Sequence, residues 1–409
     1  IGIKENDEDV SVFKKPIYLK GKLLNKATKL ELIKIDCLSE NLCNKENLDS
    51  LKIVYKILGQ TKHRTATIAF WSNTVNNYLS TLYTGDLKNL KKHVFLKIED
   101  KNIIFDSDKI EINEPIYIPS NFRVLVKPGT EIIFSKQGHI ISRSPIFFNG
   151  TTENPILIRS NFIGNIKSFR SNSLNHNIKT EKNGYGIVVI NANEVSEIDN
   201  TVFYRMSAPP QLSGLGLLGS INFYQSDVRI KNSEFLENMV GDDYLNIIRS
   251  NFVLKNCIFK DVNLDAVDID FSKGVMSKLN FQESGNDALD FSGSEVELKE
   301  INIYGAGDKA ISVGEKSKIS INDISVFNSK IGLASKDNSS LEANNVKISN
   351  TRYGVVSYMK KNEYGPSKIN IKDILVSNSE EKYLVEKGSS IKVNNRDIPS
   401  VDFNFKNFM

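Results

Sequence analysis

A repeat of 22 residues constrains the fold of this chain more than any other feature of its sequence. The motifs Asp-Ala-Val-Asp, Asp-Ala-Leu-Asp and Lys-Ala-Ile-Ser begin at positions 265, 287 and 309. The same step reaches back to Tyr244 and forward to Gly332 and Gly354, so six successive repeats keep register. A fixed period of roughly 20 to 50 residues indicates a solenoid or a propeller.

Each repeat contains three short segments with the pattern of a strand. An apolar column leads the first segment, and two further segments alternate apolar with polar residues, as in Val296/Leu298 and Ile301/Ile303. Alternation with period two is typical of a strand that buries one face. One coil cannot bury its apolar residues alone, whereas stacked coils form continuous columns of parallel strands. The pattern therefore predicts a parallel β-helix of triangular cross-section with about 22 residues per coil. The leading column is Leu245, Val267, Leu289, Ile311, Leu333 and Val355.

The first 95 residues lack this repeat, and we expect them to form a small α/β segment that caps the first coil. Residues 17–24 and 29–36 are expected strands, and Leu48–Leu58 is an expected helix. A solenoid end left bare would expose apolar core and unpaired strand edges. The predicted boundaries are 1–95 for the cap, 96–398 for the β-helix and 399–409 for a C-terminal tail.

Three segments interrupt the regular coils. Residues 160–183 are rich in Asn and Ser, and Met206–Gly219 contains two Pro and three Gly before its end, so both are expected to be loops outside the solenoid. The coil from Gly354 to Lys382 is six residues longer than the others. It carries Tyr358, Lys360, Lys361, Glu363 and Tyr364, a loop that either stacks a sugar ring or simply bulges. Trp71 is expected to be a core residue of the cap.

Composition excludes some classes of protein and leaves others open. No apolar run approaches the roughly 20 residues that span a bilayer. Acidic residues outnumber basic ones two to one in 241–300, which argues against a nucleic-acid groove there. Cys37 and Cys43 are near enough in sequence to bridge in an oxidising compartment, and free thiols are equally compatible with the sequence. Cys257 falls at a core position. The chain opens without Met or a signal peptide, so we expect a processed piece of a longer precursor.

The Asn-Asp-Ala-Leu-Asp and Asp-Lys-Ala-Ile-Ser cores, at 286–290 and 308–312, resemble the degenerate repeats of the pectate lyase-like superfamily. The stretch from Ile116 to Phe134 resembles the opening coil of right-handed β-helices, so the resemblance implies a right-handed solenoid. This superfamily includes lyases, hydrolases, epimerases, adhesins and phage tailspikes, so it specifies no activity. Gly241-Asp242-Asp243 is similar to the paired-aspartate motif of polygalacturonase-type glycosidases, but the family's Gly-His-Gly and Arg-Ile-Lys are absent. Polygalacturonase activity is therefore not predicted.

The 22-residue step also aligns acidic residues in two columns. The first is Asp243, Asp265 and Asp287, followed by Lys309, and the second is Asn246, Asp268, Asp290 and Ser312. Asp268 and Asp290 each follow a residue of the buried apolar column, so they are predicted to point outward as neighbours on the surface. Ala266, Ala288 and Ala310 would keep this surface shallow enough for a chain-like ligand.

Two carboxylates about 4.8 Å apart repel by about 1 kcal/mol in water and about 3 to 4 kcal/mol at an effective dielectric constant of 20. A raised pKa, a nearby cation or a bound Ca²⁺ would offset this repulsion. The candidate catalytic residues are Asp268, Asp290, Lys309 and Arg249. The candidate Ca²⁺ ligands are Asp243, Asp265, Asp268, Asp287 and Asp290. Alternatively, these aspartates cap turns and remain solvated.

These observations favour a secreted or cell-surface protein that binds an acidic or neutral polysaccharide or other glycan along one face. A carboxylic acid of raised pKa can protonate a glycosidic oxygen. By the resemblance, Ca²⁺ would bind a uronate carboxylate while a Lys or Arg base removes the C5 proton, as in a lyase or an epimerase. The alternative is a non-enzymatic structural or adhesive surface module in which the solenoid is a rigid spacer.

Overall fold

The protein consists of two compact units, residues 1–77 and residues 78–409. The structure is a computed structural model that describes residues 2–5, 8–12, 51–56, 61–67, 85, 87–161, 184–209, 217–361 and 363–402. Several sequence predictions lie outside these described residues. They are the strands at 17–24 and 29–36, the pair Cys37 and Cys43, Trp71 and most of the loop at 160–183.

The first unit contains a four-stranded antiparallel sheet in the order β2-β1-β3-β4. Its strands are β1 (Gly2–Glu5), β2 (Glu8–Val12), β3 (Leu51–Lys56) and β4 (His63–Thr67). The helix predicted at Leu48–Leu58 is therefore wrong, because β3 occupies that stretch. Its Ile53, Val54 and Tyr55 are β-branched or aromatic residues that favour strands, and β3 pairs on both sides.

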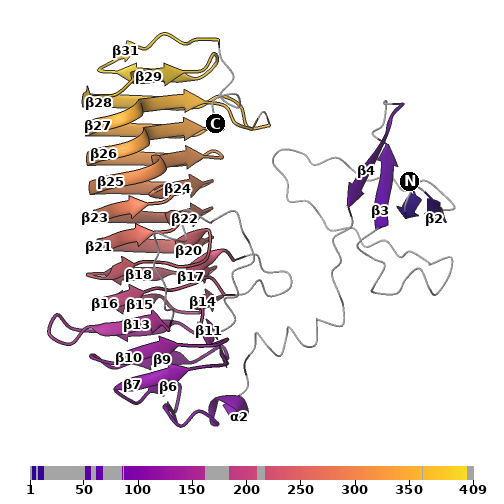
Figure 1. Cartoon of the computed structure of the whole chain (residues 1–409), viewed down its shortest axis with the longest axis vertical. Helices are drawn as coiled ribbons and strands as arrows, with labels where there is room; N and C mark the ends of the chain where they lie inside the picture. The colour runs from indigo at the N-terminus through magenta and orange to yellow at the C-terminus, as the bar shows by residue number, and fades with distance from the viewer. Residues whose placement is uncertain are drawn as a thin grey trace. The chain divides into compact units, whose positions relative to one another are not determined.

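The second unit is a solenoid of stacked parallel strands that form three sheets (Figure 1). Three long strands run continuously through the corners between sheets, namely β25 (Glu295–Gly314), β26 (Lys318–Lys336) and β27 (Ser340–Tyr358). Adjacent coils pair in parallel, as Leu298↔Ile321 and Ile301↔Ile324 show. This arrangement confirms the predicted parallel β-helix.

The first sheet contains the leading strand of each coil. Its strands are β8 (Pro115–Ile118), β11 (His139–Ser142), β14 (Ile187–Ile190), β17 (Gly219–Tyr224), β20 (Asp243–Ile248), β22 (Asp265–Asp270), β24 (Leu289–Ser292), the last parts of β25, β26 and β27, and β29 (Glu381–Val385).

The second sheet contains β6 (Asn102–Phe105), β9 (Arg123–Val126), β12 (Ile146–Asn149), β15 (Ser196–Asp199), β18 (Val228–Lys231), the first parts of β21 (Asn251–Val262), β23 (Lys273–Ser284), β25, β26, β27 and β28 (Lys368–Ser377), and β30 (Ser390–Val393).

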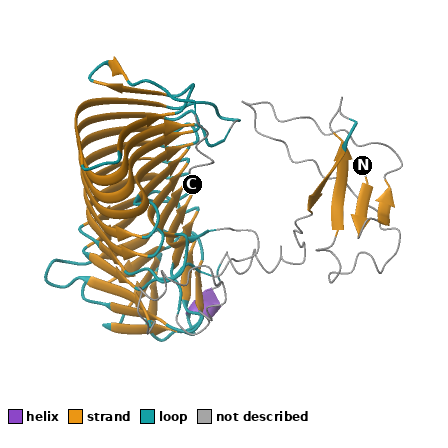
Figure 2. Ribbon diagram, turned by 45° about the horizontal axis from the view of Figure 1, so that its top comes forward, coloured by secondary structure: helices purple, strands orange, loops and turns teal. Residues whose placement is uncertain are grey.

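The third sheet contains β7 (Lys109–Ile112), β10 (Glu131–Phe134), β13 (Ile156–Ser160), β16 (Thr201–Tyr204) and β19 (Glu234–Leu236), then the later parts of β21, β23, β25, β26, β27 and β28. Figure 2 shows how the strands of successive coils wind around a common axis.

The interior of the solenoid is one continuous apolar core from Leu90 to Ile391. Phe235, Phe259 and Phe281 stack on successive coils with ring centroids 4.4 and 5.0 Å apart. A ladder of buried serines lines the corner between the first and second sheets, where each hydroxyl accepts the backbone N–H of the preceding coil's serine. The ladder satisfies backbone groups at the corner, where the strands turn out of the sheet. Its members include Ser250, Ser272, Ser294, Ser317 and Ser339.

Short elements close the two ends of the solenoid. At one end α2 (Leu87–Leu90) buries Leu90 in the core, and β5 (Leu96–Glu99) pairs antiparallel with β6. At the other end β31 (Arg396–Asp397) pairs antiparallel with β30. Part of the predicted cap at 1–95 therefore covers the first coil, and the role of residues 1–77 stays a prediction. Among the described helices, none is long and apolar enough to cross a membrane.

Two side-chain predictions for the surface are wrong. Ala266, Ala288 and Ala310 are fully buried in the core, because the strand turns at its start and brings two successive residues inward. They do not form a shallow outer surface. Tyr358 ends β27 and is fully buried, so it is not part of an exposed loop.

Candidate functional site

The outward face of the first sheet is apolar at both ends and charged in the middle. Near the N-terminal end, Leu217 packs on this face, as expected of a loop that covers the solenoid. Near the C-terminal end, a second buried apolar cluster lies on the same face. The charged part of the face, from β20 to β26, is bounded by these two clusters. The first cluster comprises Ile141, Val188, Ile190 and Leu217, and the second Ile331, Ala334, Tyr353, Val356 and Tyr358.

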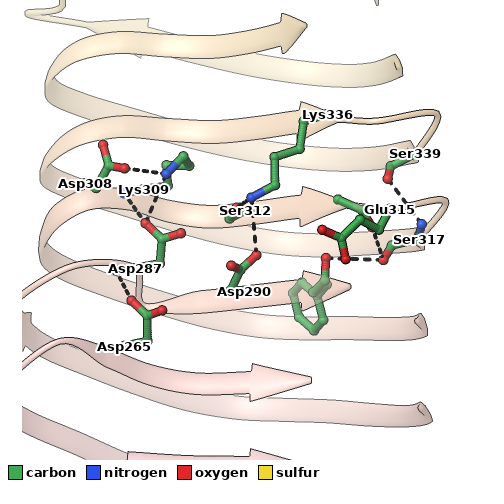
Figure 3. Close-up of polar contacts among 12 residues, drawn as sticks. Asp265, Asp287, Asp290, Asp308, Lys309, Ser312, Glu315, Ser317, Lys336 and Ser339 are labelled. Atoms are coloured by element: carbon green, nitrogen blue, oxygen red, sulfur yellow. Dashed lines mark hydrogen bonds and ion pairs between the residues drawn. The ribbon is translucent and has the colours of Figure 1, made fainter. Parts of the chain in front are cut away.

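The predicted column of Asp243, Asp265, Asp287 and Lys309 forms at the start of these strands. Its members are between 2% and 7% exposed. Asp265 Oδ1 accepts the backbone N–H of Asp287 at 2.7 Å, and Asp287 Oδ1 accepts the backbone N–H of Lys309 at 2.8 Å (Figure 3). Lys309 Nζ lies 3.4 Å from Asp287 Oδ1 and also contacts Asp308. Asp265 and Asp287 thus support the next coil's backbone, but they are buried and not solvated as the structural alternative expects.

The second predicted column, Asn246, Asp268, Asp290 and Ser312, also has the expected register. Asn246 Nδ2 donates to Asp268 Oδ2 at 3.1 Å and to Asp243 Oδ2 at 3.0 Å, so one amide joins the two columns. Asp268 and Asp290 are half-buried. Their Cα atoms are direct partners on adjacent strands, as the sequence predicted.

Lys336 reaches this column from two coils away because Gly314 leaves space for it. A Cβ atom on Gly314 would lie 2.6 Å from Lys336 Cε, so the lysine stem occupies the place of a side chain at 314. Lys336 Nζ donates to Ser312 Oγ at 2.8 Å and lies 3.7 Å from Asp290 Oδ1 (Figure 3). The lysine is only 8% exposed, so its contact with Asp290 is largely shielded from solvent.

Burial and mutual repulsion favour the neutral forms of the neighbouring carboxyls. Burial, followed by the charges of Asp242 and Asp265, raises the pKa of Asp243 well above its usual range. Burial also raises the pKa of Asp268 well above its usual range, with the charge of Asp243 next in importance. Both pKa shifts are in the direction that favours the protonated form.

The other carboxyls have smaller shifts in the same direction. Burial, with the charge of Asp287, raises the pKa of Asp265 to about 8. Burial, with the charge of Asp290, raises the pKa of Asp270 to about 6. Burial raises the pKa of Asp287 to about 6 although Lys309 opposes the shift. Burial alone would lower the pKa of Lys309, but Asp287 and Asp308 outweigh it and raise that pKa, so Lys309 stays charged.

One corner of this cluster has the ligands that a hard cation prefers. Carboxylate oxygens of Asp242, Asp243 and Asp265 lie within 4.8 Å of one another. Two oxygens bound to one Ca²⁺ at about 2.3 to 2.6 Å can be no more than about 5 Å apart, so this spacing fits. Asn246 is 4% exposed, and its Oδ1 accepts no hydrogen bond from the described residues. That orphaned oxygen belongs to a side chain in contact with this group, because Asn246 Nδ2 donates to Asp243.

Comparison with known proteins identifies the fold. Residues 243–398 match the family model described as "Right handed beta helix region". The chain is a right-handed β-helix protein. This confirms the fold that the resemblance to the pectate lyase-like superfamily implied. No curated protein matches the sequence.

Solved structures with this fold match the β-helix protein at low sequence identity. Tailspike protein 2 from Escherichia coli O157:H7 bacteriophage CAB120 is 13% identical, with a TM-score of 0.40 over 70% of this chain. The match covers only 39% of the tailspike's own length. The periplasmic alginate epimerase AlgG is 12% identical, with a TM-score of 0.42 over 73% of this chain and 82% of the epimerase. The catalytic domain of a GH87 α-1,3-glucanase with nigerose is 12% identical, with a TM-score of 0.36 over 72% of this chain and 65% of that domain.

The β-helix brings together most of the predicted site residues. Asp243, Asp265, Asp268, Asp287, Asp290 and Lys309 all lie on neighbouring strands of one sheet. Of the five predicted Ca²⁺ ligands, Asp243 and Asp265 belong to the group of closely spaced oxygens, and Asp242 joins them. Arg249 is exposed at the corner after β20, where it contacts the hydroxyl of Tyr224 at 3.4 Å rather than a carboxylate.

Sequence reasoning missed three charged residues of the site. Asp270 lies two residues after Asp268 on β22, so period-two alternation could have placed it on the same face. Lys336 follows Asp270 at three steps of 22, so the repeat could have found it too. Lys360 was predicted only as part of a loop. Burial, with the charges of Lys336 and Lys309, lowers the pKa of Lys360, which indicates that three lysines gather at this end of the site.

Two surface grooves on the β-helix lie on the second sheet, away from the carboxylates. One has a volume of about 670 Å³ and is lined by residues such as Lys273, Val275 and Glu297. Its charged side chains form exposed pairs, for example Lys273 with Glu295 at 3.1 Å, which are typical of a solvated surface. The candidate site stays with the first sheet, because there charged groups are buried and their proton affinities are changed.

Proposed function

We propose that this β-helix protein binds a polysaccharide along the charged part of the first sheet and transforms it by acid–base chemistry. The observation that carries the proposal is a pair of neighbouring carboxyls in different electrostatic surroundings. Burial and the charge of Asp243 raise the pKa of Asp268, and its neighbour Asp290 lies beside the lysine Lys336. Two carboxyls whose surroundings differ in this way are the arrangement that glycosidic-bond chemistry uses.

The lysines favour substrates that carry negative charge. Lys309 remains protonated between Asp287 and Asp308, so it suits charge neutralisation better than proton removal. Lys360 has a lowered pKa and is exposed at the same end of the site. It is therefore the better candidate for the base of a lyase or an epimerase, which removes the proton next to a uronate carboxylate.

Ca²⁺ is part of this proposal. Asp242, Asp243, Asp265 and the Oδ1 atom of Asn246 would hold the ion, since all are oxygen donors and the carboxylates have suitable spacing. A bound cation would neutralise repulsion among the carboxylates and attract the carboxylate of a uronate. A polymeric substrate of this kind is met outside the cytoplasm, so the proposal includes a secreted or cell-surface location.

The test is turnover of polygalacturonate, alginate and dextran, measured by new reducing ends and by absorbance of unsaturated products. The double variant Asp268→Asn with Asp290→Asn should lower kcat by at least about a hundredfold, because general acid–base groups contribute roughly that much. Asp373→Asn is the matched control, since Asp373 is exposed on another face. Full activity in the double variant would reject the proposed site.

The second candidate function is a non-enzymatic adhesive module, favoured by the hydrogen bonds of Asp265 and Asp287 to the backbone of the next coil. Such bonds stabilise the solenoid whether or not any substrate is bound. Binding of a polymer without turnover, unchanged in the double variant, would support this candidate over the enzyme.

A further inference from the structure

The corner that follows the first sheet places one residue in each of five successive coils in the left-handed region of backbone conformation. These residues succeed one another at the edge of the charged face, and the first four donate their backbone N–H to the next coil. Polar residues and glycine tolerate a positive φ better than bulky side chains do. The series is Gln225, Arg249, Phe271, Gly293 and Glu315, with φ between 48° and 63°.

Phe271 is the exception in this series. Across the described residues, 28 residues other than glycine have positive φ, and Phe271 is the only apolar one among them. Every other member is Asp, Asn, Glu, Gln, Lys or Arg. Phe271 has a φ of 49°, and it is 57% exposed. The positive φ costs conformational energy, and an exposed ring regains little of it by burial. Folding alone therefore does not explain a phenylalanine at this position.

The ring is held in place by its neighbours on the adjacent coils. A Cβ atom on Gly293 would lie 2.6 Å from Phe271 Cδ1, so the ring occupies the space of a side chain at 293. On the other side, the guanidinium carbon of Arg249 is 6.0 Å from the ring centroid. Arg249 Nη1 in turn donates to the hydroxyl of Tyr224 at 3.4 Å. The corner therefore offers a flat apolar surface flanked by hydrogen-bonding groups.

This surface is continuous with the candidate site. Phe271 directly follows Asp270, which is half-buried and lies on β22 with Asp268. Asp270 lies near enough to Asp290 and Glu315 for their charges to raise its pKa. A chain-like ligand that occupies the carboxylates would thus meet Phe271 at the edge of the same sheet.

We propose that Phe271 is a binding platform on which one pyranose ring of the polysaccharide stacks, with Arg249 and Tyr224 contacting the hydroxyl groups of that sugar. The inference rests on the proposed function and extends it by one subsite. The C–H face of a pyranose is apolar and packs on an aromatic ring, while its rim of hydroxyls needs polar partners. Arg249 is thereby assigned to binding and not to proton removal.

The experiment is affinity electrophoresis of the whole chain through gels that contain polygalacturonate, alginate or dextran. Phe271→Asn removes the ring but keeps a residue that tolerates positive φ, so this variant should fold at least as well as the wild type. We expect its Kd for the bound polymer to rise about tenfold, the value of an aromatic contact of about 1.4 kcal/mol. Phe271→Trp should bind within about threefold of the wild type, because the flat surface is retained.

Tyr304→Asn is the matched control, since Tyr304 is 49% exposed on the third sheet and should leave binding unchanged. If the polymer gel retards the Phe271→Asn variant as strongly as the wild type, the platform is rejected while the proposed function stands. If none of the polymers retards the wild type in the gel and the wild type turns none of them over, both the proposed function and the platform are rejected. Loss of binding in Phe271→Asn with unchanged kcat at saturation would establish a subsite distinct from the catalytic pair.

Discussion

The outward column of the first sheet differs between the middle of the solenoid and its C-terminal coils. In the middle it consists of Asn246, Asp268, Asp290 and Ser312. In the next two coils, in the same backbone register, it continues as Ala334 and Val356, which are both fully buried. The strands wind and pair in the same way in both regions.

The comparison indicates that the winding of the coils does not require carboxylates at these positions. Burial of a charged group costs free energy that apolar residues at the same place would not cost. Asp268 and Asp290 therefore need a reason other than the fold, and a ligand-binding role supplies one. Asp265 and Asp287 differ from them, because their oxygens accept backbone N–H groups and so contribute to the stacking of coils.

The largest expected effect comes from placing a carboxylate in the apolar region. Val356→Asp should lower the free energy of unfolding by about 3 to 5 kcal/mol, because the new charge would be fully buried without a cation nearby. Val356→Ala, which removes packing alone, should cost about 1 to 2 kcal/mol. Urea denaturation measures both variants. Equal losses for the two would show that the C-terminal coils accept charge as readily as the middle does.

A smaller effect is expected from pH. The carboxyl of Asp265 has its pKa raised to about 8, so the native state holds this proton more tightly than the unfolded chain does. The proton on Asp265 therefore stabilises the native state fully near pH 4, and this stabilisation is lost as the pH rises to about 8. Asp265→Asn keeps the oxygen that accepts the N–H of Asp287 and removes the titration.

Urea denaturation at pH 5 and pH 8 tests this expectation. Relative to the wild type, Asp265→Asn should gain about 2 kcal/mol between pH 5 and pH 8, which is about half of the roughly 4 kcal/mol that three pH units at about 1.4 kcal/mol each could supply. Asp373→Asn, an exposed carboxyl outside the cluster, should gain nothing over the same interval. A parallel pH response in wild type and Asp265→Asn would contradict the burial of charge in the middle coils.

The smallest effect is expected from Ca²⁺. An ion that binds only the native state at ten times its Kd should stabilise it by about 1.4 kcal/mol. The shift in thermal unfolding should be lost in Asp243→Asn and after addition of EDTA. Mg²⁺ at the same concentration should have less effect, since it demands a tighter octahedral geometry. An unmoved transition in 10 mM Ca²⁺, about ten times the Kd of the weakest extracellular sites, would remove the ion from the proposal.

The architecture could be predicted because its cause is periodic. The apolar column from Leu245 to Val355 repeats at one interval, and only a coil of that length stacks these residues in register. The pairing of Asp268 with Asp290 followed from the same interval. The errors occurred where the period was weak or absent. The sequence predicts a helix at Leu48–Leu58, where β3 forms instead. It also predicts Ala266 on the outer surface, because alternation does not hold at the start of its strand.

The site was only partly predictable, because several of its contacts cross coils through space that glycine leaves open. Lys336 contacts the Asp290 column over Gly314, and Phe271 lies over Gly293. The step of 22 residues aligns Gly314 with Lys336 and Phe271 with Gly293, but it does not show that the two larger side chains extend along the helix axis over the glycines. Only the stacked coils show that both side chains occupy the space above a glycine.

By itself, the sequence determined the period of the solenoid, the apolar core and the presence of two acidic columns, because these depend on which residues recur at a fixed interval. Only the tertiary structure decided which carboxyls are buried, which lysines approach them and which ring is exposed at the corner. Burial and proton affinity depend on all the neighbours of a group in space, and those neighbours come from coils that are far apart along the chain.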